Sequence, residues 1–116
     1  SAAPTPVGVT VRRLARRLER RCRARGWRYA RASTGLDEAG NLNLPSMIKA
    51  LHRLNATRAL SAELATHPGE PDDAARARYP WGYQWEAEFA ALMSGTVAHA
   101  VKEYGFTLGT FADLVA

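Results

Sequence analysis

The chain has 116 residues, of which 47% are hydrophobic and 23% are charged, and its formal net charge is +5. This composition is typical of one globular domain and excludes an intrinsically disordered chain. No segment reaches the roughly 20 apolar residues of a membrane span. The single cysteine, Cys22, excludes an intrachain disulfide and favours a reducing, cytoplasmic location.

The N-terminal part is predicted to contain a tail and then a helix. Residues 1–8, SAAPTPVG, hold two prolines and neither a basic nor an apolar run, which favours a flexible tail or linker. The single domain is expected over residues 9–116. Its first helix covers residues 10–25, since Val11, Leu14, Leu18 and Cys22 recur at spacings of three and four. Gly26 then ends the helix.

The positive charge of the chain is concentrated in this first part. Residues 1–31 contain ten arginines and one glutamate, a charge of +9, whereas residues 32–116 contain six basic and ten acidic residues, a charge of −4. On the predicted helix the arginines cover the face opposite the apolar stripe. Like charges four residues apart repel one another, and an anionic partner would remove that repulsion.

Residues 27–44 permit a short β-hairpin. Trp27 and Tyr29 alternate with smaller and basic residues, and the stretch LDEAGNLNL, residues 36–44, supplies turn chemistry. A basic helix, a hairpin and then a helix on PSMIKAL together resemble part of a winged-helix or helix-turn-helix lobe. The resemblance is to that general arrangement, and we transfer no residue role from it.

The next predicted helix begins at Pro45 or Ser46, with Asn43 or Ser46 as its N-cap. It either continues through Leu60 and Leu64 or breaks near Asn55. A loop at residues 67–80 follows, with three prolines and an acidic cluster. Its acidic side chains could fold over the arginine face and mask it. The apolar stripe of this helix consists of Met47, Ile48, Leu51 and Leu54.

Residues 84–104 are predicted to form one long amphipathic helix at the centre of the core. The stretch YPWGYQW before and within it places aromatic residues at alternate positions. Three interpretations stay open at this point: an aromatic cover over the core, a contact surface for a partner protein, or a shelf that binds a ligand. The aromatic residues of this stretch are Tyr79, Trp81, Tyr83 and Trp85.

Catalytic motifs are not evident in the sequence. His52, His67 and His99 are far apart, and no metal-ligand spacing or nucleophile pair emerges. Glu88, His99 and Glu103 share one predicted helix, but a polar helix face produces such groups by default. We therefore expect no catalytic residue, no metal and no cofactor.

The resulting hypothesis is a mainly α, single small domain of four or five helices, with a winged-helix-like hairpin at residues 27–44 as an option. Its predicted function is a non-enzymatic nucleic-acid-binding module, DNA or RNA, that contacts mostly phosphates. The alternative is a protein-interaction domain of a larger multidomain protein, which docks on an acidic or apolar partner surface through the arginine helix or through the aromatic segment Trp81–Trp85. The predicted phosphate-binding residues are Arg12, Arg13, Arg16, Arg17, Arg20, Arg23 and Arg28, and the predicted stacking or interface residues are Trp27, Tyr29, Trp81 and Tyr83.

Overall fold

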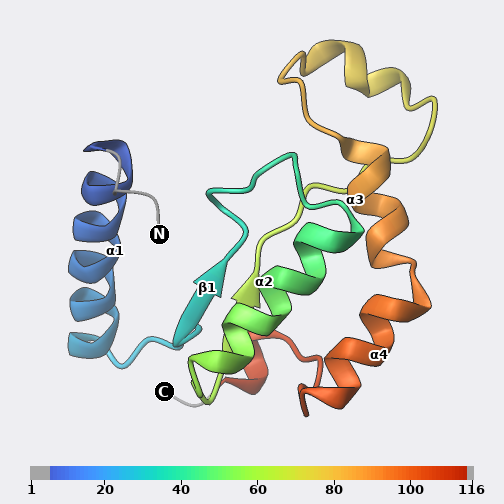
Figure 1. Cartoon of the computed structure of the whole chain (residues 1–116). Helices are drawn as coiled ribbons and strands as arrows, with labels where there is room; N and C mark the ends of the chain where they lie inside the picture. The colour runs from blue at the N-terminus through green and yellow to red at the C-terminus, as the bar shows by residue number, and fades with distance from the viewer. Residues whose placement is uncertain (1–5, 115–116) are drawn as a thin grey trace. The chain divides into compact units, whose positions relative to one another are not determined.

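The computed structural model describes residues 6–114 of the chain. These residues form four α-helices, two short 3-10 helices and one pair of three-residue strands (Figure 1). The prediction of a small, mainly α domain of four or five helices is confirmed. No helix within residues 6–114 has both the length and the apolar character that crossing a bilayer requires. The chain groups into two compact units, which contain residues 6–30 with 109–114, and residues 31–108.

The first unit is dominated by helix α1, Pro6–Ala24. A proline suits the first turn of a helix, where its missing N–H would have no intrahelical partner. The helix thus begins inside the stretch expected to be a tail, of which residues 1–5 lie outside the described part. Gly26 ends it as predicted, with φ of 63°, and the Trp27 N–H donates to the Cys22 carbonyl at 2.9 Å.

The apolar stripe predicted on this helix is present, but most of it is not buried. Val11 is 37% exposed, Leu14 is 60% exposed and Leu18 is 59% exposed, and only Cys22 is buried among the described residues of α1. Periodicity shows that a helix has an apolar face but does not show what covers that face. The hydrophobic core of the chain lies in the second unit.

The rest of the first unit is a short C-terminal turn, η2, Phe111–Asp113. The Arg28 guanidinium donates to the Ala112 carbonyl and so joins this turn to the segment after α1. The Asp113 carboxylate accepts the Thr110 N–H at 2.7 Å and the Thr110 hydroxyl at 2.9 Å. These hydrogen bonds favour the charged form and lower the pKa of Asp113 below its ordinary 3.8.

Replacing Thr110 by Val should raise the pKa of Asp113, because the hydroxyl donor is lost while the backbone N–H remains. In the wild-type chain, the contribution of this turn to stability is present above the unfolded pKa of about 3.8–3.9 and is lost as pH falls through the lower folded value. NMR titration of the Asp113 carboxyl carbon measures the folded-state pKa of Asp113 in wild type and in Thr110→Val. Equal midpoints in wild type and Thr110→Val would contradict the assignment.

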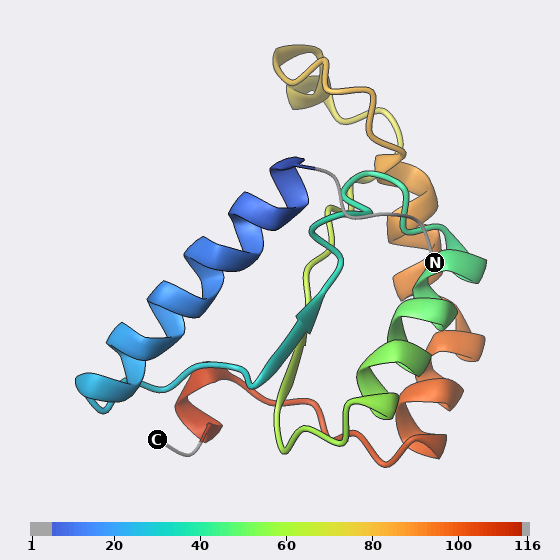
Figure 2. The same ribbon diagram turned by 60° about the vertical axis from the view of Figure 1, so that its left-hand side comes forward.

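The second unit contains strands β1, Ala32–Thr34, and β2, Ala62–Leu64, which pair in parallel. Ala32 lies opposite Ala62, and Thr34 lies opposite Leu64. The hairpin expected at residues 27–44 is therefore wrong, because its first strand pairs with a segment about 30 residues away instead. Parallel pairing needs a crossover connection, and helix α2, Leu44–Ala56, supplies it (Figure 2).

Helix α2 is the centre of the core. Asn43 caps it, accepting the Ser46 N–H at 3.2 Å, as one of the two predicted caps. It contacts both strands and both of the helices that follow (Figures 1 and 2). The helix ends at Ala56 and does not continue through Leu60 and Leu64, because Arg58 adopts a positive φ of 55°. The buried core cluster comprises Leu42, Met47, Ala50, Leu51, Ala91, Val97 and Ala100.

The long helix predicted at residues 84–104 is divided into α3, Trp85–Leu92, and α4, Gly95–Glu103. Ser94 causes the break, because its hydroxyl accepts the Thr96 N–H at 3.1 Å and caps a new helix. Both helices pack on α2, so the centre of the core is α2 and not residues 84–104. The apolar positions keep nearly the same spacing across the break, which explains why periodicity alone does not reveal it.

A buried carboxylate joins the connecting segments of this unit. Glu88, on α3, is fully buried and accepts the Leu42 N–H at 3.2 Å and the His67 N–H at 2.6 Å. Leu42 lies between β1 and α2, and His67 follows β2. Two charge-assisted hydrogen bonds to backbone amides offset the cost of burying the carboxylate. Glu88 therefore holds both connecting segments against α3.

Replacing Glu88 by Gln should destabilise the chain by about 2–3 kcal/mol, because one buried N–H would face an amide NH₂ instead of a carboxylate oxygen. Urea denaturation measures the change in the free energy of unfolding. The matched control is Glu103→Gln on α4, whose carboxylate forms an exposed pair with His99 and should change stability by about 0.5 kcal/mol or less. Equal losses in both variants would contradict a special role for Glu88.

Candidate functional site

The candidate site lies at the carboxyl ends of β1 and β2. In parallel α/β sheets, ligands bind outside this edge, where the connecting segments leave the strands. β1 ends at Thr34 and β2 at Leu64, and the segments that follow are residues 35–43 and 65–84. The longer of these segments contains His67, the 3-10 helix η1, Ala74–Arg78, and the aromatic stretch before α3.

His67 is held in place by its backbone and keeps one ring nitrogen unpaired. Its N–H donates to the Glu88 carboxylate, and its ring contacts the Tyr83 ring edge-on with centroids 5.1 Å apart. The Nδ1 atom is buried and forms no hydrogen bond within residues 6–114. By contrast, the Nδ1 atom of His52 lies 3.5 Å from the Tyr104 hydroxyl oxygen, and the Nε2 atom of His99 pairs with the Glu103 carboxylate. A buried polar atom without a partner requires an explanation, and a bound ligand is one.

Tyr83 positions this histidine against the first connecting segment. The Gln84 N–H donates to the Gly40 carbonyl at 2.8 Å, which brings Tyr83 over Gly40. Gly40 has a φ of 79°, and a Cβ there would clash with the Tyr83 ring. A glycine is thus required at position 40 by both backbone conformation and the close approach of the ring.

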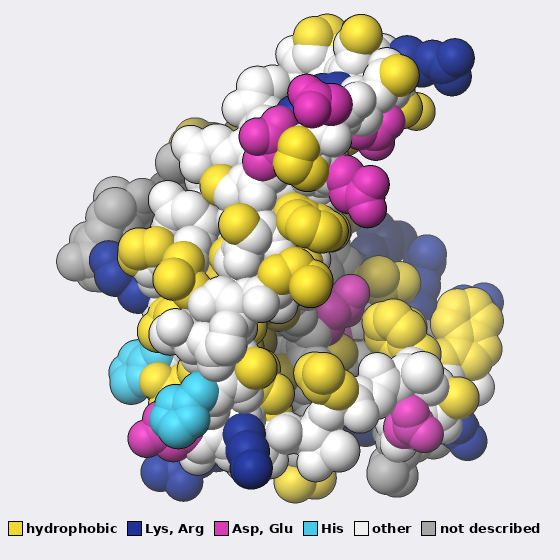
Figure 3. Space-filling view, turned by 90° about the vertical axis from the view of Figure 1, so that its right-hand side faces the viewer, with side chains coloured by type: hydrophobic (Ala, Val, Ile, Leu, Met, Phe, Trp, Pro, Cys, Tyr) yellow, Lys and Arg dark blue, Asp and Glu magenta, His cyan; other side chains and the backbone are white. Residues whose placement is uncertain are grey.

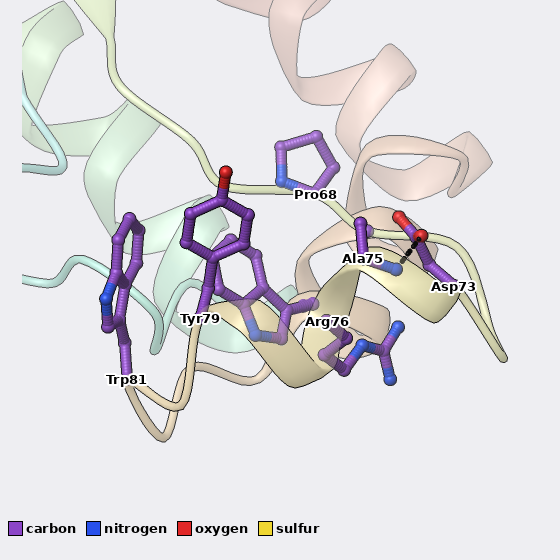
Figure 4. Close-up of a pocket in the computed structure, with 8 residues that line it drawn as sticks. Pro68, Asp73, Ala75, Arg76, Tyr79 and Trp81 are labelled. Atoms are coloured by element: carbon purple, nitrogen blue, oxygen red, sulfur yellow. Dashed lines mark hydrogen bonds between the residues drawn. The ribbon is translucent and has the colours of Figure 1, made fainter.

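A cavity of about 300 Å³ lies next to this cluster (Figure 4). Arg76 is one of the lining residues, and its guanidinium pairs with Glu86 on α3 and donates to the Glu70 carbonyl. The Asp73 carboxylate accepts the Ala75 N–H at 2.8 Å and caps η1. The residues that line the cavity are Pro68, Gly69, Asp73, Ala75, Arg76, Tyr79, Trp81 and Trp85.

The aromatic residues at alternate positions form one cluster beside the cavity. Trp81 contacts Tyr79 at 5.1 Å and Trp85 at 5.7 Å between ring centroids, and Tyr83 contacts Trp81 and Trp85. Trp81 is nevertheless 55% exposed. Tyr79 and Trp81 are thus open to solvent, as both a ligand shelf and a contact surface for a partner protein require. Figure 3 shows acidic side chains on the surface of this part of the chain. Glu70, Asp72 and Asp73 are all exposed.

The predicted arginine site lies entirely outside this region. Six of its seven arginines are on α1, all exposed, and Arg28 follows the helix. Arg23 pairs with Glu19 at 2.8 Å and with the Tyr29 hydroxyl at 2.7 Å, and these contacts raise the pKa of Arg23, chiefly through Tyr29. Trp27, a predicted stacking residue, is 53% exposed and carries the Arg25 guanidinium over its ring.

A comparison with protein-family models identifies the family of the chain. Residues 3–103 match the family described as YdjC-like protein. The chain belongs to this YdjC-like family. Members of the family are carbohydrate-deacetylase-like enzymes and not nucleic-acid-binding modules. No curated protein and no solved structure is significantly similar to the chain.

The nucleic-acid-binding function predicted for this YdjC-like chain is therefore wrong. The charge asymmetry that suggested it is present, but an arginine-rich helix face does not specify its partner, and a GC-rich genome also favours arginine. Glu88, His99 and Glu103, for which the sequence indicated only a shared polar helix face, are not assembled into a group, because Glu88 is buried and accepts the Leu42 and His67 N–H groups. An acidic protein partner for the arginines stays a prediction.

Sequence reasoning missed His67, Asp73 and Arg76 as members of a site. The available signal was HPG, residues 67–69, shortly after Ala62–Leu64, because a polar residue after a parallel strand lies at the ligand-binding edge. That signal was hidden while residues 60–64 could still be the end of a helix. Within the described residues, no group of three or more His, Cys, Asp or Glu side chains is placed to hold a metal ion.

Replacing Gly40 by Ala should destabilise the YdjC-like chain more than replacing Gly82 by Ala. Both glycines have positive φ, but a Cβ at Gly82 meets open space whereas one at Gly40 meets Tyr83. The Gly82 variant should lose about 1–2 kcal/mol for the left-handed backbone alone. The Gly40 variant should lose about 1–3 kcal/mol more through overpacking. Urea denaturation tests this order, and equal losses would show that Tyr83 does not press on Gly40.

Proposed function

We propose that this chain acts on an acetylated carbohydrate and that its reaction is hydrolytic removal of the acetyl group. The observation that carries the proposal is the position of His67, which places an imidazole with an unpaired nitrogen at the ligand-binding edge of a parallel strand pair. Membership of a family of carbohydrate-deacetylase-like enzymes supports the choice of substrate class and reaction.

The proposed reaction needs a proton to be accepted from water and then passed to the leaving atom, and an imidazole can perform both steps. Water attacks the acetyl carbonyl carbon, and a C–O bond forms while a base accepts a proton from the water. The bond from that carbon to the sugar oxygen or nitrogen then breaks, and the proton passes to this leaving atom. The products are acetic acid and the sugar with a free hydroxyl or amine. Histidine is the side chain that most often performs such transfers.

We assign this proton transfer to His67. The hydrogen bond from its N–H to Glu88 fixes the backbone, and the edge contact with Tyr83 fixes the ring. The other two histidines lie on helices α2 and α4, where their rings contact Tyr104 and Glu103, and not on the segment that follows β2. The cytoplasm remains the expected location, on the basis of the single cysteine.

Replacing His67 by Gln should lower the rate of acetate release by about 10²–10⁴-fold, the usual contribution of a general acid or base. The assay incubates the chain with an N-acetylated and an O-acetylated disaccharide and measures acetate enzymatically. His99→Gln is the matched control, since its ring is exposed on α4. Circular dichroism checks that both variants fold. Undiminished acetate release from the folded His67 variant would refute the assignment, and no release from the wild-type chain would refute the proposed function.

A further inference from the structure

The cavity beside η1 has walls suited to one flat, largely apolar molecular face. Tyr79, Trp81 and Trp85 supply the aromatic surface, and Pro68 and Ala75 complete it (Figure 4). A volume of about 300 Å³ is at the lower end of the range of roughly 300–1,000 Å³ for small-molecule pockets. The cavity therefore accommodates one ring of a ligand and not a chain of several rings.

The charged groups at the cavity are already engaged with other parts of the chain. The Arg76 guanidinium is directed at Glu86 and at the Glu70 carbonyl, and the Asp73 carboxylate caps η1 through the Ala75 N–H. An anionic ligand would compete with Glu86 for the Arg76 guanidinium. A neutral ligand would not, so the arrangement favours a neutral one.

Trp81 is the residue with the largest aromatic surface available to a ligand. Its ring contacts those of Tyr79 and Tyr83 edge-on, with interplanar angles of 60° and 66°, and that of Trp85 at a tilt of 37°. These contacts orient the indole without covering it, since the residue is 55% exposed. The face of an aromatic ring carries partial negative charge, and the C–H groups on one face of a pyranose ring carry partial positive charge.

We propose that this cavity is a subsite for one neutral pyranose ring, which stacks on Trp81 and contacts Tyr79 and Trp85. The inference rests on the proposed function and adds the part of the substrate that the chain recognises. The subsite recognises the sugar ring and not the acetyl group, because its walls are aromatic and its charged side chains already bond to other parts of the chain. An unacetylated neutral disaccharide should therefore bind there as well as an acetylated one does.

The test compares sugar binding in wild type, Trp81→Ala and Trp27→Ala. The two tryptophans are matched in exposure, at 55% and 53%, but Trp27 lies in the other compact unit. Binding of an unacetylated neutral disaccharide is measured by NMR saturation transfer and by titration of tryptophan fluorescence. Trp81→Ala should weaken binding by at least about tenfold, whereas Trp27→Ala should leave it unchanged. A disaccharide that contains a uronic acid should bind more weakly than the neutral one.

Tyr79→Ala provides a second variant should Trp81→Ala fail to fold, and it should also weaken binding. In the acetate assay, Trp81→Ala should raise KM and leave kcat nearly unchanged, because the subsite is separate from His67. Equal affinity in wild type and in the folded Trp81 and Tyr79 variants would overturn the subsite. Sugar binding that depends on Trp81 without acetate release would refute the proposed reaction alone, and acetate release that is insensitive to Trp81 would refute the subsite alone.

Discussion

The arrangement of the second unit depends on the buried carboxylate of Glu88. Parallel strands of only three residues contribute few hydrogen bonds, so the segments that follow them need another anchor. Glu88 provides it by accepting one backbone N–H from the segment after β1 and one from the segment after β2. Because both acceptor oxygens belong to one side chain on α3, the two segments cannot shift independently of each other.

The candidate site follows from this anchor. One of the two anchored amides belongs to His67, so the residue assigned to proton transfer is fixed at its backbone by a fully buried group. The next residues, Pro68 and Gly69, already line the cavity, and the Gly69 N–H donates to the Trp85 carbonyl at 3.0 Å. The residue assigned to proton transfer is thus followed directly by two residues that line the proposed sugar subsite. Preorganised groups of this kind lose little conformational entropy when a ligand binds.

Local features of the fold could be predicted from the sequence, whereas long-range pairing could not. Gly26 as a helix end and Asn43 as a cap depend on the chemistry of a few neighbouring residues, and both are confirmed. The partner of β1 depends on a segment 30 residues away, and three-residue strands leave no period-2 pattern to recognise. The site was missed for the same reason, since His67 gains its meaning only when residues 62–64 are known to be a parallel strand. The aromatic stretch was recognised, but its exposure required the structure.

The exposed apolar stripe of α1 affects how easily this helix unfolds locally. A helix gains most of its stability in a protein from packing its apolar face. Leu14 and Leu18 are mostly exposed, so their side chains contribute little packing to α1. Repulsion among the arginines of the same helix opposes its formation further. Amide protons of α1 should therefore exchange with solvent deuterium through local opening, well before those of α2. The two helices then belong to separate cooperative units, and melting of one need not expose the core around the other.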